Sequence, residues 1–295
     1  MQIMKANTAS RTAQIMAFNR ALETLLPEDE RLFNDPYAHL FLDRGLKMAC
    51  TLASFKPVRL IVTCVFQSKA PGALSSAVAR TKYIDDLLQQ ATAKGIKQLI
   101  ILGAGFDTRS SRLLCLNNIA VIEIDHPNTS KIKQEVLKMD QGGLPSNTQY
   151  LQIDFNVQNL EDLLVAQKIN FNLPTAILWE GVTNYLSAEA IDNTFQVLQR
   201  FGSGSIVIFT YIDKQVLDNP ARFKGAEKLM QDLGKLEERW TFGFKPASLA
   251  SYLLPFRFDL VEDKNAVEYR AQYLTGNKYA LQGYEFYHVA MAKRL

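Results

Sequence analysis

Glycine and acidic residues recur at the ends of short apolar segments, a pattern that suits the binding of a small polar ligand. The first segment ends in Gly103 and Gly105, where the missing side chains let a ligand approach the backbone closely. The next two segments end in Asp125 and Asp154, and a fourth ends in Glu180. Four consecutive segment ends therefore offer one glycine bend and three carboxylates.

The acids have roles that their chemistry permits. Alternation along the second segment places Glu123 and Asp125 on one face, with Asp125 at the tip, where its carboxylate can accept hydrogen bonds from two ribose hydroxyls. Asp154 precedes Phe155, so a carboxylate that can pair with an adenine amino group stands beside a ring that can pack against the base. These residues together predict a site for an adenosine-type ligand.

The same residues distinguish two adenosine ligands. A dinucleotide-binding turn usually completes G-x-G-x-x-G, whereas Thr108 stands at the third glycine position. A pyrophosphate needs cations or bare amides and is repelled by an excess of carboxylates. S-adenosyl-L-methionine has no phosphate and carries a cationic sulfonium and ammonium, so an acidic pocket suits it. The glycine bend alone is equally consistent with a tight turn in any α/β protein, but together with Asp125 and Asp154 it favours this methyl donor.

The elements that position these groups follow an alternating pattern. From about residue 95 onward, short apolar runs alternate with helical periodicity, which predicts βαβ units and a parallel sheet. We expect core strands at Gln98–Ala104, Ala120–Asp125, Thr148–Phe155, Thr175–Gly181 and Ser205–Ile212. We expect connecting helices at Thr108–Leu116, Asn128–Met139, Gln158–Lys168 and Ala188–Phe201. Because ligands bind beyond the carboxyl ends of parallel strands, the bend and the acids should meet at one edge of this sheet.

Local features predict how the helices begin and end. Ser187 is an expected N-cap, Gly202 an expected left-handed stop after Phe201, and Pro127 an expected first-turn proline. Asp107 either caps the helix that follows it or faces the ligand.

Helices and strands are also expected on both sides of the core. Amphipathic helices are predicted ahead of it at Ala9–Thr24, Pro36–Arg44 and Ala73–Ala93, where they would cover the ligand-bearing edge. A charged helical segment is expected at Asn219–Arg239, and two last strands at Arg257–Asp263 and Glu285–Lys293. We therefore expect one domain over residues 1–295, with a helical cover in 1–95, the cofactor-binding core in 96–212 and an acceptor-side segment with the final strands in 213–295.

Composition excludes several classes of function. The formal charge of +3 comes from 33 basic and 30 acidic residues without a basic run, so no nucleic-acid partner is expected. Three cysteines without CxxC spacing and three histidines without HxxxH spacing predict neither a disulfide framework nor a metal site. No apolar run approaches the ~18 residues of a membrane span. We expect a soluble, cytoplasmic protein without a membrane partner, and the oligomeric state stays open.

Several segments in chain order resemble the leucine carboxyl methyltransferase family, particularly its bacterial branch that includes polyketide carboxyl O-methyltransferases. They are ARTKYIDDLL (79–88), LGAGFDTR (102–109), EIDHP (123–127), QIDF (152–155) and WEGVTNYL (179–186). LFNDPYAHLFL (32–42) and LQGYEFYHVA (281–290) match as well, so the resemblance covers nearly the whole chain. It implies an α/β fold with a Rossmann-like class I methyltransferase sheet that is mostly parallel, an antiparallel last strand and an N-terminal helical cover.

The resemblance also implies roles for the charged and aromatic residues. Arg80 matches the arginine that holds the carboxylate of the methyl donor, and Asp125 matches the acid that binds its ribose. Glu180 matches an acid near the donor's amino group, and Tyr185 a tyrosine close to the sulfonium. Without the resemblance, a solvated helix residue is the better interpretation of Arg80. Tyr185 and Tyr211 are either core tyrosines, which the sequence favours, or part of the rim of the acceptor pocket.

The remaining matched residues belong to the turn and the adenine site. Gly103, Ala104 and Gly105 match the glycine turn, and Asp154 with Phe155 matches the adenine contacts. No residue is assigned as a catalytic base. A carboxylate acceptor needs none, because it is already a nucleophile at neutral pH, whereas a phenol or alcohol does.

These observations predict an S-adenosyl-L-methionine-dependent O-methyltransferase that acts on a carboxylate or hydroxyl of a small molecule, in secondary metabolism. Two alternatives remain. One is a regulatory protein that binds the methyl donor without turnover, and the other is an NAD-dependent oxidoreductase. The identity of the acceptor stays open.

Overall fold

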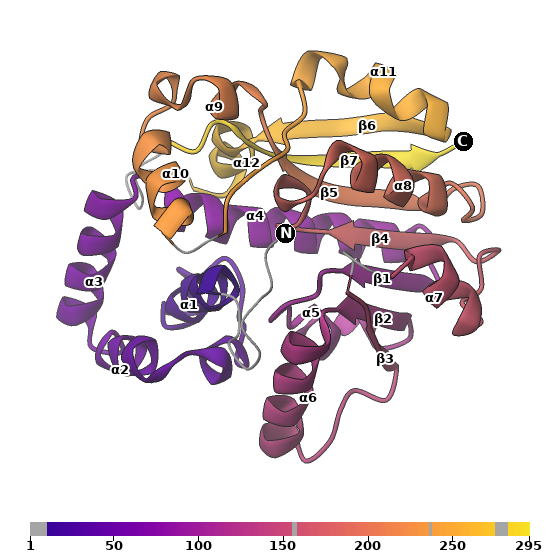
Figure 1. Ribbon diagram of the computed structural model, residues 1–295. Helices are drawn as coiled ribbons and strands as arrows, with labels where there is room; N and C mark the ends of the chain where they lie inside the picture. The colour runs from indigo at the N-terminus through magenta and orange to yellow at the C-terminus, as the bar shows by residue number, and fades with distance from the viewer. Residues whose placement is uncertain (1–10, 155–157, 236–237, 275–282) are drawn as a thin grey trace.

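A seven-stranded sheet forms the centre of the protein. The computed structural model describes residues 11–154, 158–235, 238–274 and 283–295 (Figure 1). The strands are β1 (Gln98–Leu102), β2 (Ala120–Asp125), β3 (Thr148–Gln152), β4 (Thr175–Trp179), β5 (Ile206–Ile212), β6 (Phe258–Asn265) and β7 (Tyr287–Arg294). Their order is β3-β2-β1-β4-β5-β7-β6. β1 to β5 are parallel, and β7 pairs antiparallel with both β5 and β6, which confirms the predicted α/β sheet with its antiparallel ending.

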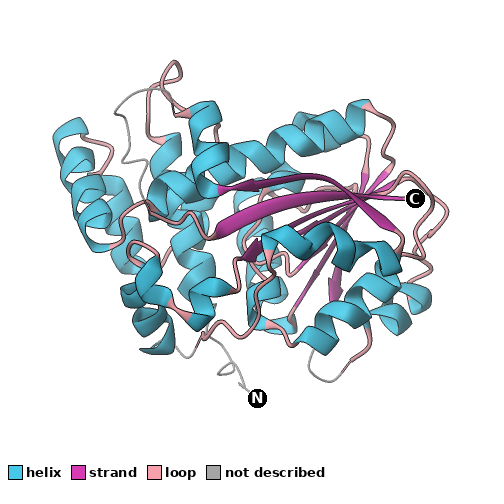
Figure 2. Ribbon diagram, turned by 90° about the horizontal axis from the view of Figure 1, so that it is seen from above, coloured by secondary structure: helices cyan, strands magenta, loops and turns pink. Residues whose placement is uncertain are grey.

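The central strands are apolar along their length because helices cover both faces of the sheet (Figure 2). Successive side chains of β1 alternate between two cores, so Leu99 and Ile101 pack on one side and Ile100 and Leu102 on the other. One face is covered mainly by α4 (Ala73–Ala93) and α12 (Ala266–Tyr273), and the other by α7 (Leu160–Ala166), α8 (Ala188–Leu198) and α11 (Leu249–Leu253).

A helical cover lies beside the sheet and includes α1 (Arg11–Thr24), α2 (Arg44–Leu52) and α3 (Lys56–Lys69) (Figure 1). Phe18 of α1 and Phe106, which follows β1, belong to the same buried cluster as Leu137 of α6 (Pro127–Gln141). The cover is therefore packed onto the segment that carries the glycine bend. The division of the chain at residues 95 and 212 stays a prediction.

Two predicted helix starts are confirmed. Ser187 accepts a hydrogen bond from the N–H of Ala190 at 3.1 Å and caps α8. Pro127 opens α6, directly after His126, whose Nδ1 accepts the N–H of Asn128 at 3.3 Å. Both caps use up N–H groups that the first helical turn leaves without partners.

The predicted left-handed stop at Gly202 is wrong. α8 already ends at Leu198, and Gly202 is not among the glycines with positive φ. Its N–H donates to the carbonyl of Phe171 at 2.8 Å, and a Cβ atom there would lie 3.1 Å from the carbonyl oxygen of Asn172. Glycine is suited to this position because two backbone segments approach each other closely.

Several predicted boundaries also change. The helix expected at Pro36–Arg44 is only a short 3-10 turn, η1 (Ala38–Phe41), because Asp43 accepts the N–H of Leu46 and starts a separate helix. The helix expected at Thr108–Leu116 shortens to α5 (Arg109–Arg112) and a 3-10 turn, η2 (Leu114–Leu116). Leu113 between them has extended backbone angles, which interrupt the helix.

The C-terminal half adds smaller elements. They are η3 (Thr183–Tyr185), α9 (Gln215–Asp218), η4 (Pro220–Arg222), α10 (Ala226–Lys235), η5 (Pro246–Ser248) and η6 (Leu254–Phe256). The helix expected over Asn219–Arg239 is thus limited to α10. Strands β1, β3 and β4 end before the glycine bend, Asp154 and Glu180, so these groups lie in the loops just beyond the strands.

Candidate functional site

The bend after β1 turns sharply through two glycines with positive φ, +66° at Gly103 and +46° at Gly105. The N–H groups of Gly103 and Ala104 both donate to the carbonyl of Ile124 in β2, at 2.8 and 3.2 Å. A Cβ atom on Gly103 would lie 2.4 Å from Cγ2 of Val182. The bend is therefore hydrogen-bonded to the neighbouring strand, and Gly103 cannot carry a side chain because Val182 occupies that space.

Asp125, at the tip of β2, completes the bend. Its Oδ2 accepts the N–H of Gly105 at 2.5 Å and its Oδ1 accepts the N–H of His126 at 2.6 Å. Burial raises the pKa of Asp125, and the two backbone N–H groups only partly offset this effect. None of the ion pairs between described residues involves Asp125, so its direct partners there are backbone N–H groups, while the charge of Lys133 acts on it from farther away. Each carboxylate oxygen keeps a second lone pair for a ligand hydroxyl.

Glu123 lies on the same face of β2, but its carboxylate is bound by side chains of the protein interior. Its Oε2 accepts from Nζ of Lys133 at 2.5 Å, and its Oε1 accepts from the hydroxyl of Ser110 at 2.7 Å. Burial raises its pKa, and the charge of Lys133 lowers it again in part. Of the two acids that alternation placed together, only Asp125 is available at the strand tip.

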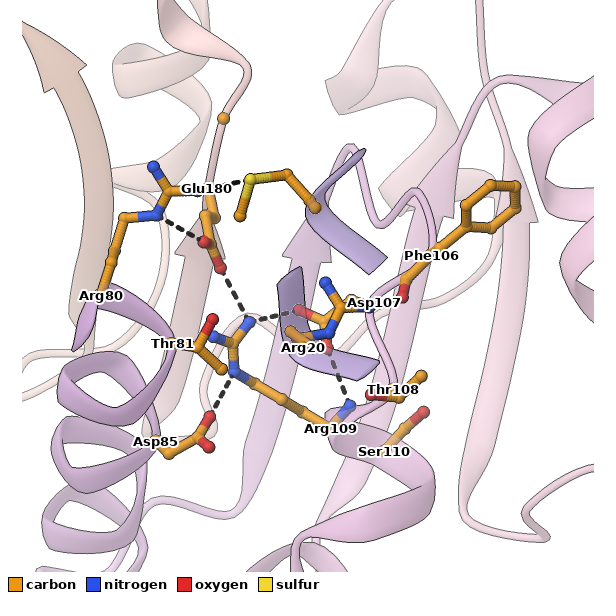
Figure 3. Close-up of polar contacts among 12 residues, drawn as sticks. Arg20, Arg80, Thr81, Asp85, Phe106, Asp107, Thr108, Arg109, Ser110 and Glu180 are labelled. Atoms are coloured by element: carbon orange, nitrogen blue, oxygen red, sulfur yellow. Dashed lines mark hydrogen bonds and ion pairs between the residues drawn. The ribbon is translucent and has the colours of Figure 1, made fainter. Parts of the chain in front are cut away.

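Arg80 of α4 and Glu180, which follows β4, contact each other directly (Figure 3). The Nε of Arg80 donates to Oε1 of Glu180 at 2.8 Å, and its guanidinium carbon lies 4.6 Å from the ring centroid of Tyr287. Only 6% of Arg80 is exposed, which contradicts the alternative of a solvated helix residue. Its Nη2 lies 3.4 Å from the sulfur of Met16, a weak acceptor that a stronger one can replace.

A second arginine, Arg109, lies at the centre of three carboxylates. It donates to Asp85 at 2.7 Å, to Asp107 at 2.5 Å and to Oε2 of Glu180 at 2.8 Å (Figure 3). Burial would raise the pKa of Glu180, but the charges of Arg109 and Arg80 outweigh it and hold the pKa below its usual value. Glu180 is therefore ionised and compensated by two guanidinium groups.

The same network reaches the helical cover. Asp35 accepts from Arg20 of α1 at 2.7 Å and from the hydroxyl of Thr108 at 2.7 Å, and Arg20 also donates to the carbonyl of Phe106 at 2.5 Å. Thr108, which replaces the third glycine of a dinucleotide turn, thus ties the loop after β1 to the cover. Arg112 donates to both oxygens of Asp85 and links the contacts around Arg109 with those around Asp35.

The other predicted site residues lie less centrally in the described structure. Asp154 follows β3 and is partly exposed, and its backbone N–H donates to Oε1 of Gln158 at 2.9 Å. Phe155 lies outside the described residues. Tyr185 packs against the cluster that contains Trp240 and Tyr287, and burial raises its pKa to about 12. Its hydroxyl is consequently protonated at neutral pH.

Solvent exposure returns at the strand ends. The strands β1 and β4 are buried throughout, whereas Gly103, Gly105, Asp125, Asp154 and Glu180 all keep partial exposure. Because β3, β2, β1 and β4 are neighbours in the sheet, these groups share its carboxyl edge. The structure therefore gathers the predicted glycine bend and acids at one edge.

Sequence reasoning missed the charge network. Asp35, Asp85, Asp107 and Arg109 stand in the segments LFNDPYAHLFL, ARTKYIDDLL and LGAGFDTR. Asp107 was expected to cap a helix or face the ligand, and no role was assigned to the other three. Asp107 accepts the N–H of Arg109, the first residue of α5, at 2.8 Å as well as its guanidinium. It therefore belongs to the network and also binds a backbone N–H next to the N-cap residue Thr108. The sequence signal that could have indicated this network was that each of these segments contains an acid or an arginine to which no role in donor binding had been given.

Tyr211 is a core residue, which settles the alternative left open for it. It is fully buried, donates to Asp263 at 2.6 Å and lies 3.1 Å from Nδ1 of His288.

Two cavities open away from the predicted site. One, of about 370 Å³, lies between α4, α12 and β6, and the other, of about 630 Å³, lies at the amino ends of β1 to β3.

Within the described parts of the chain, no group of three or more His, Cys, Asp or Glu residues could hold a metal ion. In those same parts, no helix has the length and apolar character needed to cross a membrane.

Comparison with known proteins points to one family. Residues 13–199 match the family described as leucine carboxyl methyltransferase. A protein of Mycobacterium bovis (strain BCG / Pasteur 1173P2), provisionally named an S-adenosyl-L-methionine-dependent methyltransferase, is 31% identical over 228 residues, which cover 73% of this chain and 72% of the relative. A protein of Mycobacterium sp. (strain MCS) with the same provisional name is 32% identical over 157 residues, 53% of this chain. The match spans only 61% of that relative's length.

Solved structures share the fold. A provisionally named methyltransferase from Thermobifida fusca superposes with a TM-score of 0.58 at 18% identity, covering 94% of both chains. A protein of the duf574 family from Streptomyces avermitilis gives the same TM-score at 13% identity, covering 98% of this chain and 99% of that one. At these identities the likeness concerns the fold alone.

Proposed function

The chain belongs to the leucine carboxyl methyltransferase family, and we propose that it is an S-adenosyl-L-methionine-dependent O-methyltransferase acting on a small-molecule carboxylate. When bound, the donor supplies an electrophilic methyl group on a sulfonium. The chain itself binds and orients the two reactants and excludes water. Relatives with the corresponding provisional name support this proposal, and so does the geometry at the carboxyl edge of the sheet.

The observation that carries the proposal is the state of Asp125. The buried acids around it are neutralised by cations, Glu123 by Lys133 and Glu180 by two arginines. Among the described residues, Asp125 has two backbone N–H partners and no ion pair, and burial raises its pKa. A buried carboxylate without a cation is costly unless further donors reach it. The two hydroxyls of a ribose are donors of the required kind for a carboxylate at the tip of the strand.

The other site residues also fit this donor. Gly181 has a φ of +72°, and a Cβ atom there would meet nothing within 4 Å, so the backbone beside Glu180 is open. Arg80 stays cationic, because Tyr287 and Glu180 outweigh the effect of burial on its pKa, and it can exchange its contact with a sulfur for the donor's carboxylate. The oxygens of Glu180 each retain a lone pair for the donor's ammonium group.

The structure favours a carboxylate over a hydroxyl as acceptor. Tyr185, the residue matched to the sulfonium end, has a pKa of about 12 and remains protonated, so it cannot accept a proton from an alcohol at neutral pH. His126 already uses its Nδ1 as the cap of α6. A carboxylate needs no base and reacts once it is held in line behind the methyl carbon in a site that excludes water.

Binding of the donor is tested by calorimetry with S-adenosylhomocysteine and with NAD. We expect S-adenosylhomocysteine to bind and NAD to bind at least roughly tenfold more weakly, because carboxylates repel a pyrophosphate. Asp125→Asn should weaken S-adenosylhomocysteine roughly ten- to hundredfold, as expected for the loss of a charge-assisted hydrogen bond. Asp140→Asn, an exposed acid on α6, is the matched control and should change nothing. Tight binding of NAD instead would contradict the proposal.

Turnover is tested with donor labelled in the methyl group and panels of small carboxylic acids, phenols and alcohols. A methyl ester releases its label as methanol in mild alkali, whereas a methyl ether does not. Alkali-labile product from the acids is expected. Donor binding without transfer to any panel would favour a regulatory protein, and alkali-stable product would favour a hydroxyl acceptor.

A further inference from the structure

The outer side of the helical cover exposes large apolar side chains that no described residue covers. They belong to α2, α3 and the turn between them, and 44–67% of each residue is exposed. We define the cover patch as these residues, Met48, Leu52, Phe55, Leu60, Ile61 and Val65. Figure 1 shows α2 and α3 at the margin of the molecule, away from the sheet. Six large exposed apolar side chains on two consecutive helices and the turn between them are uncommon unless they bind something.

The two sides of α3 explain why the patch faces outward. Val62 and Phe66, one turn apart, pack against the buried cluster of the cover. Ile61 and Val65, also one turn apart, lie on the adjacent stripe of the helix and are 63% and 44% exposed. None of the residues of α3 is fully buried. The apolar residues of this helix thus exceed what its inward face needs for folding.

The same segment is strongly basic. Residues 44–69 contain five cations and no aspartate or glutamate, which leaves 28 basic against 30 acidic residues in the rest of the chain. The cations are Arg44, Lys47, Lys56, Arg59 and Lys69. All but Arg59 are exposed, and none takes part in an ion pair between described residues. The positive charge of the chain is therefore concentrated around the cover patch.

We propose that the cover patch docks on an anionic phospholipid membrane surface. Apolar side chains that project from short amphipathic helices and are flanked by lysine and arginine insert at the level of the headgroups, where anionic lipids attract the cations. A second copy of the chain is disfavoured, because a symmetric interface would place five cations against the same five. The proposal does not depend on the methyl-transfer activity.

Flotation of the full chain with vesicles tests the proposal. Vesicles of phosphatidylcholine containing about one third phosphatidylglycerol should carry the protein upward, whereas phosphatidylcholine alone should not, and high salt should weaken the binding. The double variant Ile61→Ser/Val65→Ser should lose most of the binding. Lys47→Gln/Lys56→Gln should weaken it roughly fivefold per lysine. Leu114→Ser, at a leucine that is 84% exposed outside the patch, is the matched control and should bind as wild type.

Several results would overturn the proposal. One is that the wild-type protein does not bind the anionic vesicles, or that the patch variants bind them as strongly as the wild type does. Another is that soluble polyglutamate binds as strongly as the anionic vesicles do and that Ile61→Ser/Val65→Ser does not change this binding. That result would assign the surface to an acidic protein. A third is a dimer, measured by light scattering, that this double variant abolishes. Thermal unfolding checks each variant, and the lysine variant keeps the test decisive if the apolar variant fails to fold.

Discussion

Replacing Arg109 with methionine is the sharpest test of the charge network at the site. The side chain is 3% exposed and donates to Asp85, Asp107 and Glu180 at 2.5–2.8 Å. Methionine fills similar volume without the charge, so the variant separates the electrostatic role of Arg109 from its packing.

The expected loss of stability depends on which ion-pair partner each carboxylate retains in the variant. Glu180 keeps Arg80 at 2.8 Å and Asp85 keeps Arg112 at 2.7 Å, whereas Asp107 has no second ion pair among the described residues. Removing one partner of a buried pair costs about 3–5 kcal/mol. With one stranded carboxylate out of three, we expect about 3 kcal/mol, which lowers the Tm by roughly 6 °C in a chain of this size.

The loss should depend on pH. Burial would raise the pKa of Asp107, but the charges of Arg109 and Lys133 outweigh it and hold the pKa well below its usual value. An acid of this kind stabilises the fold above its unfolded pKa of about 3.9, and this contribution disappears as the pH falls through the folded pKa. In Arg109→Met the pKa of Asp107 rises, so protonation relieves the stranded charge in mild acid. The difference from wild type should be full at pH ~7.5 and smaller at pH ~4.5.

Urea unfolding followed by circular dichroism at both pH values measures the effect. Arg200→Met is the matched control, because its pair with Glu161 is exposed (42% and 45% of the side chains) and should contribute at most about 1 kcal/mol. The reasoning fails if Arg109→Met destabilises the protein no more than Arg200→Met does. It also fails if the difference from wild type is the same at the two pH values.

Two further predictions concern the backbone. Gly103→Ala should destabilise the fold by about 2 kcal/mol or more and reduce binding of S-adenosylhomocysteine, because φ is +66° and the new Cβ would clash with Val182. The control Gly142→Ala, with φ +71° and open space, should cost only about 1 kcal/mol. Equal Tm changes in the two variants would refute the steric argument. Asn265→Ala should cost about 1 kcal/mol, measured by urea unfolding, because Asn265 and Glu268 form a capping box at α12; an unchanged midpoint would show that the cap does not contribute.

The sheet was predictable because its strands are buried on both faces. Continuous apolar runs such as Gln98–Leu102 and Thr175–Trp179 identify parallel strands without knowledge of their neighbours. Helices of the cover were harder to predict. α3 carries apolar residues on outward as well as inward sides, so the stripe that faces the core is not clearly separated from the rest of the helix.

The site was predictable where it depends on local chemistry and unpredictable where it depends on distant partners. The glycine bend and Asp125 could be identified from the sequence, because a sharp turn requires glycine and alternation places the acid at a strand tip. The contact between Arg80 and Glu180 joins residues 100 positions apart, and no local pattern encodes it. The roles of the predicted donor-binding residues stay predictions until binding is measured.

The sequence by itself determined the order of strands and helices, the backbone bend and the presence of acids after the strands, because each depends on residues a few positions apart. Only the tertiary structure decided which of those acids is neutralised. Glu180 and Glu123 form ion pairs with cations from other elements, whereas Asp125 forms none among the described residues and accepts backbone N–H groups there. The physical reason is that compensation of a buried charge depends on groups that folding brings within about 3 Å, whatever their separation along the chain.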